Sequence, residues 1–101
     1  MSENPMATEL PSLLTRVLLE IEGLRRAGAP TAEEWRGAHE ELERFASRQK
    51  NLVPRELAEE VEASIEAARG ALTRQDVEGA REALLGIGRA LDAWVRNQRD
   101  L

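Results

Sequence analysis

Residues 76–98, with the sequence DVEGAREALLGIGRALDAWVRNQ, carry the clearest structural pattern in the chain. Their apolar side chains recur at alternating steps of three and four residues, which places them on one face of an α-helix. A strict alternation of this kind is also the heptad seam of left-handed helical bundles. The seam consists of Val77, Ala80, Leu84, Ile87, Leu91 and Trp94. We therefore expect a long helix that buries this seam against other helices.

The rest of the chain repeats the helical spacing. The first stretch has leucine, valine or isoleucine at most of its inward positions, whereas the second stretch is the least apolar and is closed by Gln49. Four such stripes can be buried together, so the sequence predicts an all-α four-helix bundle built from two antiparallel helical hairpins. The expected helices cover approximately residues 8–28, 31–50, 54–73 and 76–98. Residues 1–7 are expected to form a flexible tail, and residues 8–101 a single helical domain.

Local signals mark the ends of these helices. Gly28 suits a left-handed cap, and Pro30 cannot continue a helical hydrogen-bond ladder. Thr31 begins a T-x-x-E capping box with Glu34, which predicts the start of the second helix. These residues place the first hairpin turn close to residue 29.

The second half of the chain has its own boundary signals. Pro54 suits the first position of the third helix, where a missing N–H costs nothing. The turn between the third and fourth helices is short, which favours an antiparallel pair. Either Thr73 or Asp76 could cap the fourth helix.

Composition excludes several classes of chemistry. The 101 residues include no cysteine, which rules out disulfides, thiolate nucleophiles and cysteine metal ligands. The net charge is −5 and no face is strongly basic, so we expect no nucleic acid as partner. No apolar run approaches the roughly 20 residues of a transmembrane helix, and we expect a cytoplasmic protein without membrane contact.

The sequence has little that resembles a catalytic or cofactor site. His39 is the only histidine and lies at the margin of the second helical stripe, where a structural role is the simpler interpretation. No serine lies in a nucleophile elbow, and Gly86-Ile87-Gly88 falls inside a helix instead of a phosphate-binding loop. We expect no enzyme activity, cofactor or metal. The alternative is a small-molecule-binding bundle or small enzyme with a pocket lined by His39 and inward arginines, for which Arg16, Arg69, Arg81 and Arg89 are conceivable donors.

A second stripe on the last helix predicts an interaction surface. It consists of small residues at steps of four and three, about 110° around the helix from the apolar seam. Glycine inside a helix costs about 1 kcal/mol relative to alanine, so its presence here needs a reason. One possible reason is that another helix of the same chain packs against the stripe, and a second is a coding bias toward glycine and alanine. A third is that the stripe is a docking surface. In that case Leu19 and Leu85, which lie off the seam, could extend it into an apolar patch. The candidate interface is therefore Gly79, Ala83, Leu85, Gly86, Ala90, Ala93 and Leu19.

These observations favour a non-enzymatic helical bundle that acts through protein–protein interaction. Self-association as a homodimer is the commonest use of such a surface, and another protein is the further possible partner. Adaptors, chaperone-like proteins and antitoxin-like inhibitors all have this character. The sequence does not choose among them.

Overall fold

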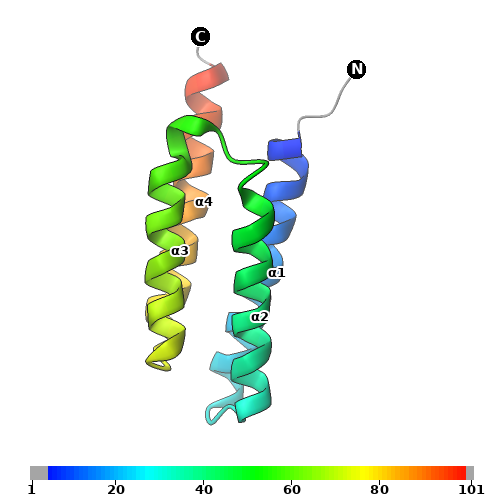
Figure 1. Cartoon of the computed structure of the whole chain (residues 1–101), viewed down its shortest axis with the longest axis vertical. Coiled ribbons are helices and arrows are strands. Elements are labelled where there is room, and N and C mark those ends of the chain that lie inside the picture. Colours follow the sequence, from blue (N-terminus) through cyan, green and yellow to red (C-terminus); the bar gives the residue numbers. More distant parts are fainter. Residues whose placement is uncertain (1–4, 100–101) are drawn as a thin grey trace.

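The computed structural model describes residues 5–99 and confirms the all-helical bundle (Figure 1). No residue in this range belongs to a β-strand. Helix α2 is Ala32–Gln49, and a short 3₁₀ turn, η1, precedes helix α3. The full element order is α1 Pro5–Ala27, α2 Ala32–Gln49, η1 Arg55–Leu57, α3 Ala58–Thr73 and α4 Val77–Arg99.

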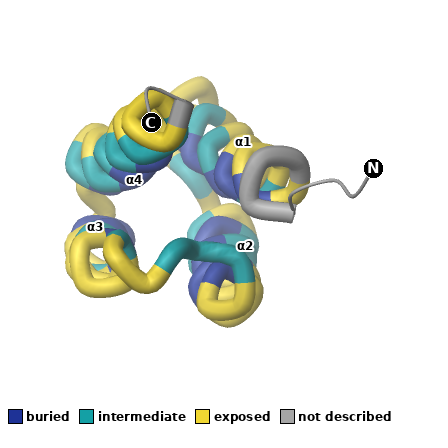
Figure 2. Tube along the Cα trace, turned by 90° about the horizontal axis from the view of Figure 1, so that it is seen from above, coloured by how far each residue is buried: buried dark blue, intermediate teal, exposed yellow. Residues whose placement is uncertain are grey.

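The helices follow one another around a square (Figure 2). Each helix lies between two neighbours, and the buried positions turn toward the centre. Figure 1 shows the chain reversing direction at each connection, so α1 and α2 form one hairpin and α3 and α4 form the other. The pair α3–α4 is the most extensively packed, and the two hairpins meet along α1–α4 and α2–α3.

The predicted seam of α4 faces the core and forms one side of it. Leu84 and Ala80 are fully buried, Ile87 and Leu91 nearly so, and the end positions Val77 and Trp94 are half-buried. The other helices contribute aliphatic side chains and one aromatic ring from the stripes that the sequence shows. The largest of these buried side chains are Leu10, Val17, Ile21, Leu42, Phe45, Val61, Ile65 and Leu72.

The first hairpin turn has the predicted caps. Gly28 adopts φ +74°, a left-handed conformation that favours glycine. The Glu34 backbone N–H donates to the Thr31 hydroxyl at 3.2 Å, and the Thr31 N–H donates to the Glu34 carboxylate at 2.9 Å. These two bonds are the expected capping box, and they satisfy donors that the start of α2 would otherwise leave free.

The second hairpin turn is tighter than the sequence suggests. The Asp76 N–H donates to the Ala71 carbonyl at 2.7 Å and the Gln75 N–H to the Leu72 carbonyl at 3.0 Å, which is a Schellman motif. Gln75 takes the left-handed position usually held by glycine, with φ +59°. Asp76 then begins α4 at once, because its carboxylate accepts the Gly79 N–H at 2.9 Å.

Two boundaries differ from the prediction, and the structure selects one of the two predicted caps of the fourth helix. Helix α1 begins at Pro5 instead of residue 8, since a proline at the first helical position needs no hydrogen-bond partner. The rest of the predicted tail, residues 1–4, lies outside the described range. Pro54 is extended (φ −59°, ψ 146°) and precedes η1, so it is not the first residue of a continuous helix over 54–73. The cap of α4 is Asp76, while the Thr73 hydroxyl donates to a carbonyl within α3.

Gln49 connects the two hairpins. Its side chain is only 2% exposed, and its amide Nε2 donates to the Ala46 carbonyl at 3.1 Å and to the Glu62 carboxylate at 2.9 Å. Its own carbonyl accepts from the Leu52 and Val53 N–H groups at 2.9 and 2.8 Å. Gln49 therefore ends α2 and fixes α3 beside it.

Candidate interaction surface

A groove lies along the outside of α3 and α4 near the end where α4 finishes. It has a volume of about 580 Å³. Its floor combines apolar or small side chains of both helices, and its rim carries a carboxylate, a guanidinium, a hydroxyl and an amide. We call it the α3–α4 groove; the residues that line it are Leu57, Glu60, Ser64, Gly86, Arg89, Ala90, Ala93, Trp94 and Asn97.

Three members of the predicted small-residue stripe line this groove: Gly86, Ala90 and Ala93. A Cβ atom built on Gly86 would meet only the far end of Arg89, at 3.8 Å. The absence of a side chain at Gly86 is therefore not required by packing within the chain. Gly86 and Ala90 are half-buried and Ala93 is exposed, so this part of the stripe is open to a partner.

The other two members of the stripe have structural explanations. A Cβ atom on Gly79 would lie 2.3 Å from the carboxylate of Asp76, the residue that caps α4. Ala83 is half-buried and packs against the core. The stripe thus divides into a capping position, a packing position and an open half, and only the open half remains a candidate for docking.

Leu19 and Leu85 do not join the groove. Leu19 is 66% exposed on α1, where it is the only large apolar side chain of the described range with such exposure. Leu85 is half-buried on the flank of α4 that also carries Gly88, and a Cβ atom built on Gly88 would lie 3.5 Å from the Leu14 side chain of α1. Neither leucine lines the groove, so the predicted apolar patch that would include both of them stays a prediction.

Polar contacts set the register of the groove. The Trp94 indole N–H donates to the Glu56 carboxylate at 3.3 Å, which places the end of α4 beside η1. Since α3 and α4 are antiparallel, Glu60 on α3 then lies level with Ala90 on α4, and Arg89 is the next residue on the rim. The groove thus has one acidic and one basic side at the same height.

Sequence reasoning found the α4 side of the groove but not the α3 side. On this side the groove is lined by Leu57, Glu60 and Ser64, which follow the helical spacing of three and four residues. That spacing was available in the sequence. The seam predicts Trp94 as a core position, and only the structure shows that Trp94 and Leu57 are half-buried and line the groove.

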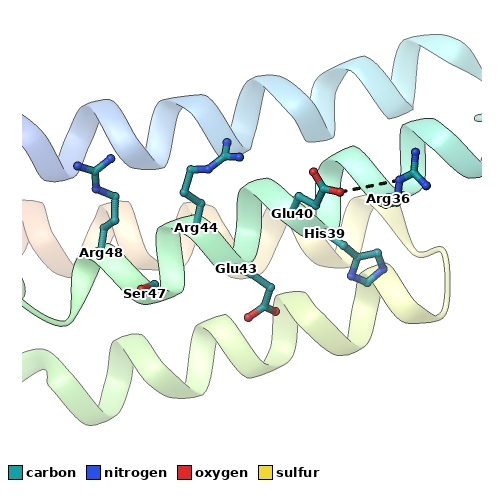
Figure 3. A pocket seen from close by; sticks show the side chains of 7 residues that line it. All are labelled: Arg36, His39, Glu40, Glu43, Arg44, Ser47 and Arg48. Carbon is teal, nitrogen blue, oxygen red and sulfur yellow. Dashed lines mark ion pairs between the residues drawn. The ribbon is translucent and has the colours of Figure 1, made fainter.

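The outer face of α2 forms a shallower depression, shown in Figure 3. Arg44 and Arg48 point toward α1, whereas Glu43 points toward α3 (Figure 3). His39 is half-buried at the margin of α2, where the sequence places it. Arg36 pairs with Glu40 at 3.8 Å, while Arg44 and Arg48 point away from Glu43, so the charged groups of this face do not converge on one point (Figure 3). Across the described range, no three histidine, aspartate or glutamate side chains are grouped closely enough to hold a metal ion.

One pair on this face joins the two hairpins. Arg69 of α3 donates from Nε and Nη2 to the two carboxylate oxygens of Glu43, at 2.6 and 2.9 Å, and also pairs with Glu66. The hydrogen bond from Arg69 holds the pKa of the Glu43 carboxyl below its usual value, while Glu43 and Glu66 raise the pKa of the guanidinium. Both side chains are partly exposed, which makes this pair a surface clamp between the two hairpins.

The arginines of the alternative function lie on separate surfaces. Arg16 lines a small groove between α1 and α2, Arg69 is paired with Glu43, and Arg89 lines the α3–α4 groove. They do not share one cavity. The predicted arginine-lined pocket therefore gains no geometric support from these residues.

Comparisons with known proteins add no relative: no family model matches the chain, and no curated protein or solved structure is similar to it. Within the described residues, none of the helices combines the length and apolar character needed to cross a bilayer.

Proposed function

We propose that this protein is a non-enzymatic interaction module that binds a second copy of itself through the α3–α4 groove. The observation that carries the proposal is the open half of the small-residue stripe. Gly86, Ala90 and Ala93 lie beside Leu57 and Trp94, so a groove with an apolar floor faces outward where none of the described helices covers it.

The physical basis of the proposal is that a second helix can approach α4 closely at this groove. Residues without long side chains let a second helix come near the backbone of α4, and the neighbouring leucine and indole supply apolar area. Burying that area removes it from water, which is the main favourable term in association. An isologous homodimer uses one such surface twice and is the commonest assembly of soluble proteins.

Sedimentation velocity on the purified chain tests the proposal. The wild type is expected to sediment as a dimer at tens of micromolar. Ala90→Glu places a charged side chain in the groove and is expected to give a monomer with unchanged helix content. Ala32→Glu is the matched control, because it makes the same change at an exposed alanine in the first turn of α2, at the opposite end of the bundle.

The outcomes are distinct. A wild type that remains monomeric at these concentrations contradicts self-association. A dimer that persists in Ala90→Glu shows that the interface lies elsewhere on the molecule. Circular dichroism on each variant separates loss of the dimer from loss of the fold.

A further inference from the structure

The α3–α4 groove has an acidic and a basic rim residue that are almost unused within the chain. Glu60 is exposed and forms no ion pair within the described residues. Arg89 is 69% exposed, and its one ion pair, with Glu82, spans 3.9 Å at the limit of such contacts. Both charges are therefore free to meet a partner across the groove.

Symmetry gives two ways to place a second copy on this face. A two-fold axis across the helices sets α4 against its own copy and α3 against its own copy. At the height of the groove, it brings Glu60 toward Glu60 of the second copy and Arg89 toward Arg89, so like charges meet. A two-fold axis along the groove instead sets α3 against α4 of the second copy.

Only the second arrangement joins opposite charges. Because Glu60 and Arg89 lie at the same height on neighbouring antiparallel helices, rotation about an axis parallel to those helices exchanges their sides without changing their height. Glu60 then faces Arg89 of the second copy, and the pair occurs twice. We propose that the dimer axis runs along the α3–α4 groove, with these two reciprocal ion pairs at its rim; this inference rests on the self-association proposed above.

The charge order along the helices supports the same arrangement. Helix α3 and the turn before it begin with Glu56, Glu59 and Glu60 against Arg55, whereas the later half of α4 carries Arg89 and Arg96 against Asp92. An axis along the groove keeps these two ends at one height, so the acidic beginning of α3 faces the basic end of α4 in the second copy. Attraction between them also orients the encounter and weakens as salt rises.

Charge reversal tests the arrangement by sedimentation velocity or equilibrium. Glu60→Arg sets arginine against arginine, and Arg89→Glu sets glutamate against glutamate, so each is expected to raise the dimer Kd by about tenfold or more. The double variant Glu60→Arg/Arg89→Glu restores opposite charges and is expected to regain most of the affinity. Arg26→Glu on the exposed end of α1 is the control for a change in net charge.

A second readout uses mixtures. Equal amounts of the Glu60→Arg and Arg89→Glu chains are expected to form a mixed dimer, because both rim pairs are then opposite in charge. Mass spectrometry under native conditions distinguishes it from either homodimer, and circular dichroism verifies that each chain is folded.

Each result decides between the two proposals. If the wild type is a monomer, both fail. If Ala90→Glu dissociates the dimer while neither charge reversal changes its Kd, the groove is the interface but the proposed axis is wrong. If the single reversals weaken the dimer and the double variant does not recover, Glu60 and Arg89 do not face each other and the axis is again overturned.

Discussion

Gln49→Glu is expected to destabilise the bundle strongly at neutral pH. The change replaces the amide nitrogen by an oxygen of nearly the same size, so packing is preserved while hydrogen bonding is reversed. In the native chain this nitrogen donates to the Glu62 carboxylate at 2.9 Å and to the Ala46 carbonyl at 3.1 Å. In the variant, a second carboxylate faces the first, and an oxygen faces the carbonyl.

The magnitude follows from these contacts. A hydrogen bond to a charged group contributes about 1.5–3 kcal/mol, and that contribution is lost. Two carboxylates about 4 Å apart repel by roughly 4 kcal/mol at an effective dielectric constant of 20, although proton uptake relieves part of this. Because Gln49 is 2% exposed, water cannot replace the lost partners. We expect a loss of about 3–5 kcal/mol in the free energy of unfolding, comparable to breaking a buried charge pair.

The expected pH dependence gives a second signature. Burial and the neighbouring carboxylate should raise the pKa of the introduced glutamate in the folded state. A raised acid binds more protons when folded than when unfolded, so the destabilisation is present near pH 7 and shrinks as the pH falls through the raised pKa. The loss relative to wild type should therefore be smaller at pH 4 than at pH 7.

Urea denaturation followed by circular dichroism measures both effects. Gln98→Glu is the matched control, because it makes the same substitution on an exposed part of α4 and should change stability by less than about 0.5 kcal/mol. Equal stability of the two variants at pH 7 would refute the assigned role of Gln49. So would a loss in Gln49→Glu that does not change with pH.

Three further expectations concern the core, a turn and a surface clamp. Leu84→Ala removes a fully buried side chain and should cost about 2–5 kcal/mol in urea denaturation, whereas Leu19→Ala at a 66% exposed position should stay within about 0.5 kcal/mol. Gln75→Gly relieves a left-handed residue at φ +59° and should raise stability, by up to about 1 kcal/mol; a lower melting temperature would contradict the strain. Because Arg69 lowers the pKa of Glu43, the clamp stabilises the fold above the usual carboxyl pKa of 4.5 and loses this effect as the pH falls below it. Arg69→Gln should thus be less stable than wild type by about 0.2–1 kcal/mol at pH 7, with the gap closing in acid; a constant gap over a pH series would argue against the clamp.

Periodic apolar spacing predicted most of the fold because helical burial is a repeating local property. The seam of α4 and the capping box at Thr31 are where the sequence places them. Pro54 was assigned to the wrong role, since a proline suits both the first turn of a helix and the extended residue before one. The 3₁₀ turn that follows is joined to α4 by the bond from Trp94 to Glu56, which no local pattern reveals.

The sequence predicted the α4 side of the candidate site but not its α3 side. The small residues of α4 are visible as a stripe, but their partition depends on neighbours in space: Gly79 is explained by the Asp76 carboxylate, and Gly86 has an open flank. The sequence predicts that Leu19 and Leu85 extend the same surface, because a helical wheel gives the angles within one helix and not the positions of the other helices. Only the arrangement of the four helices shows which side of α4 faces α3 and which side faces α1.

The helices follow one another around the bundle, so the last helix, α4, lies beside the first, α1. The first described turn of α1 and the last turn of α4 lie at the same end of the bundle (Figure 1). A linker joining these two ends, with the chain opened between Lys50 and Pro54, would keep both hairpins and every helix neighbour intact. Such a circular permutant would show that the two hairpins are interchangeable modules, and that the order in which they are synthesised is not part of the architecture.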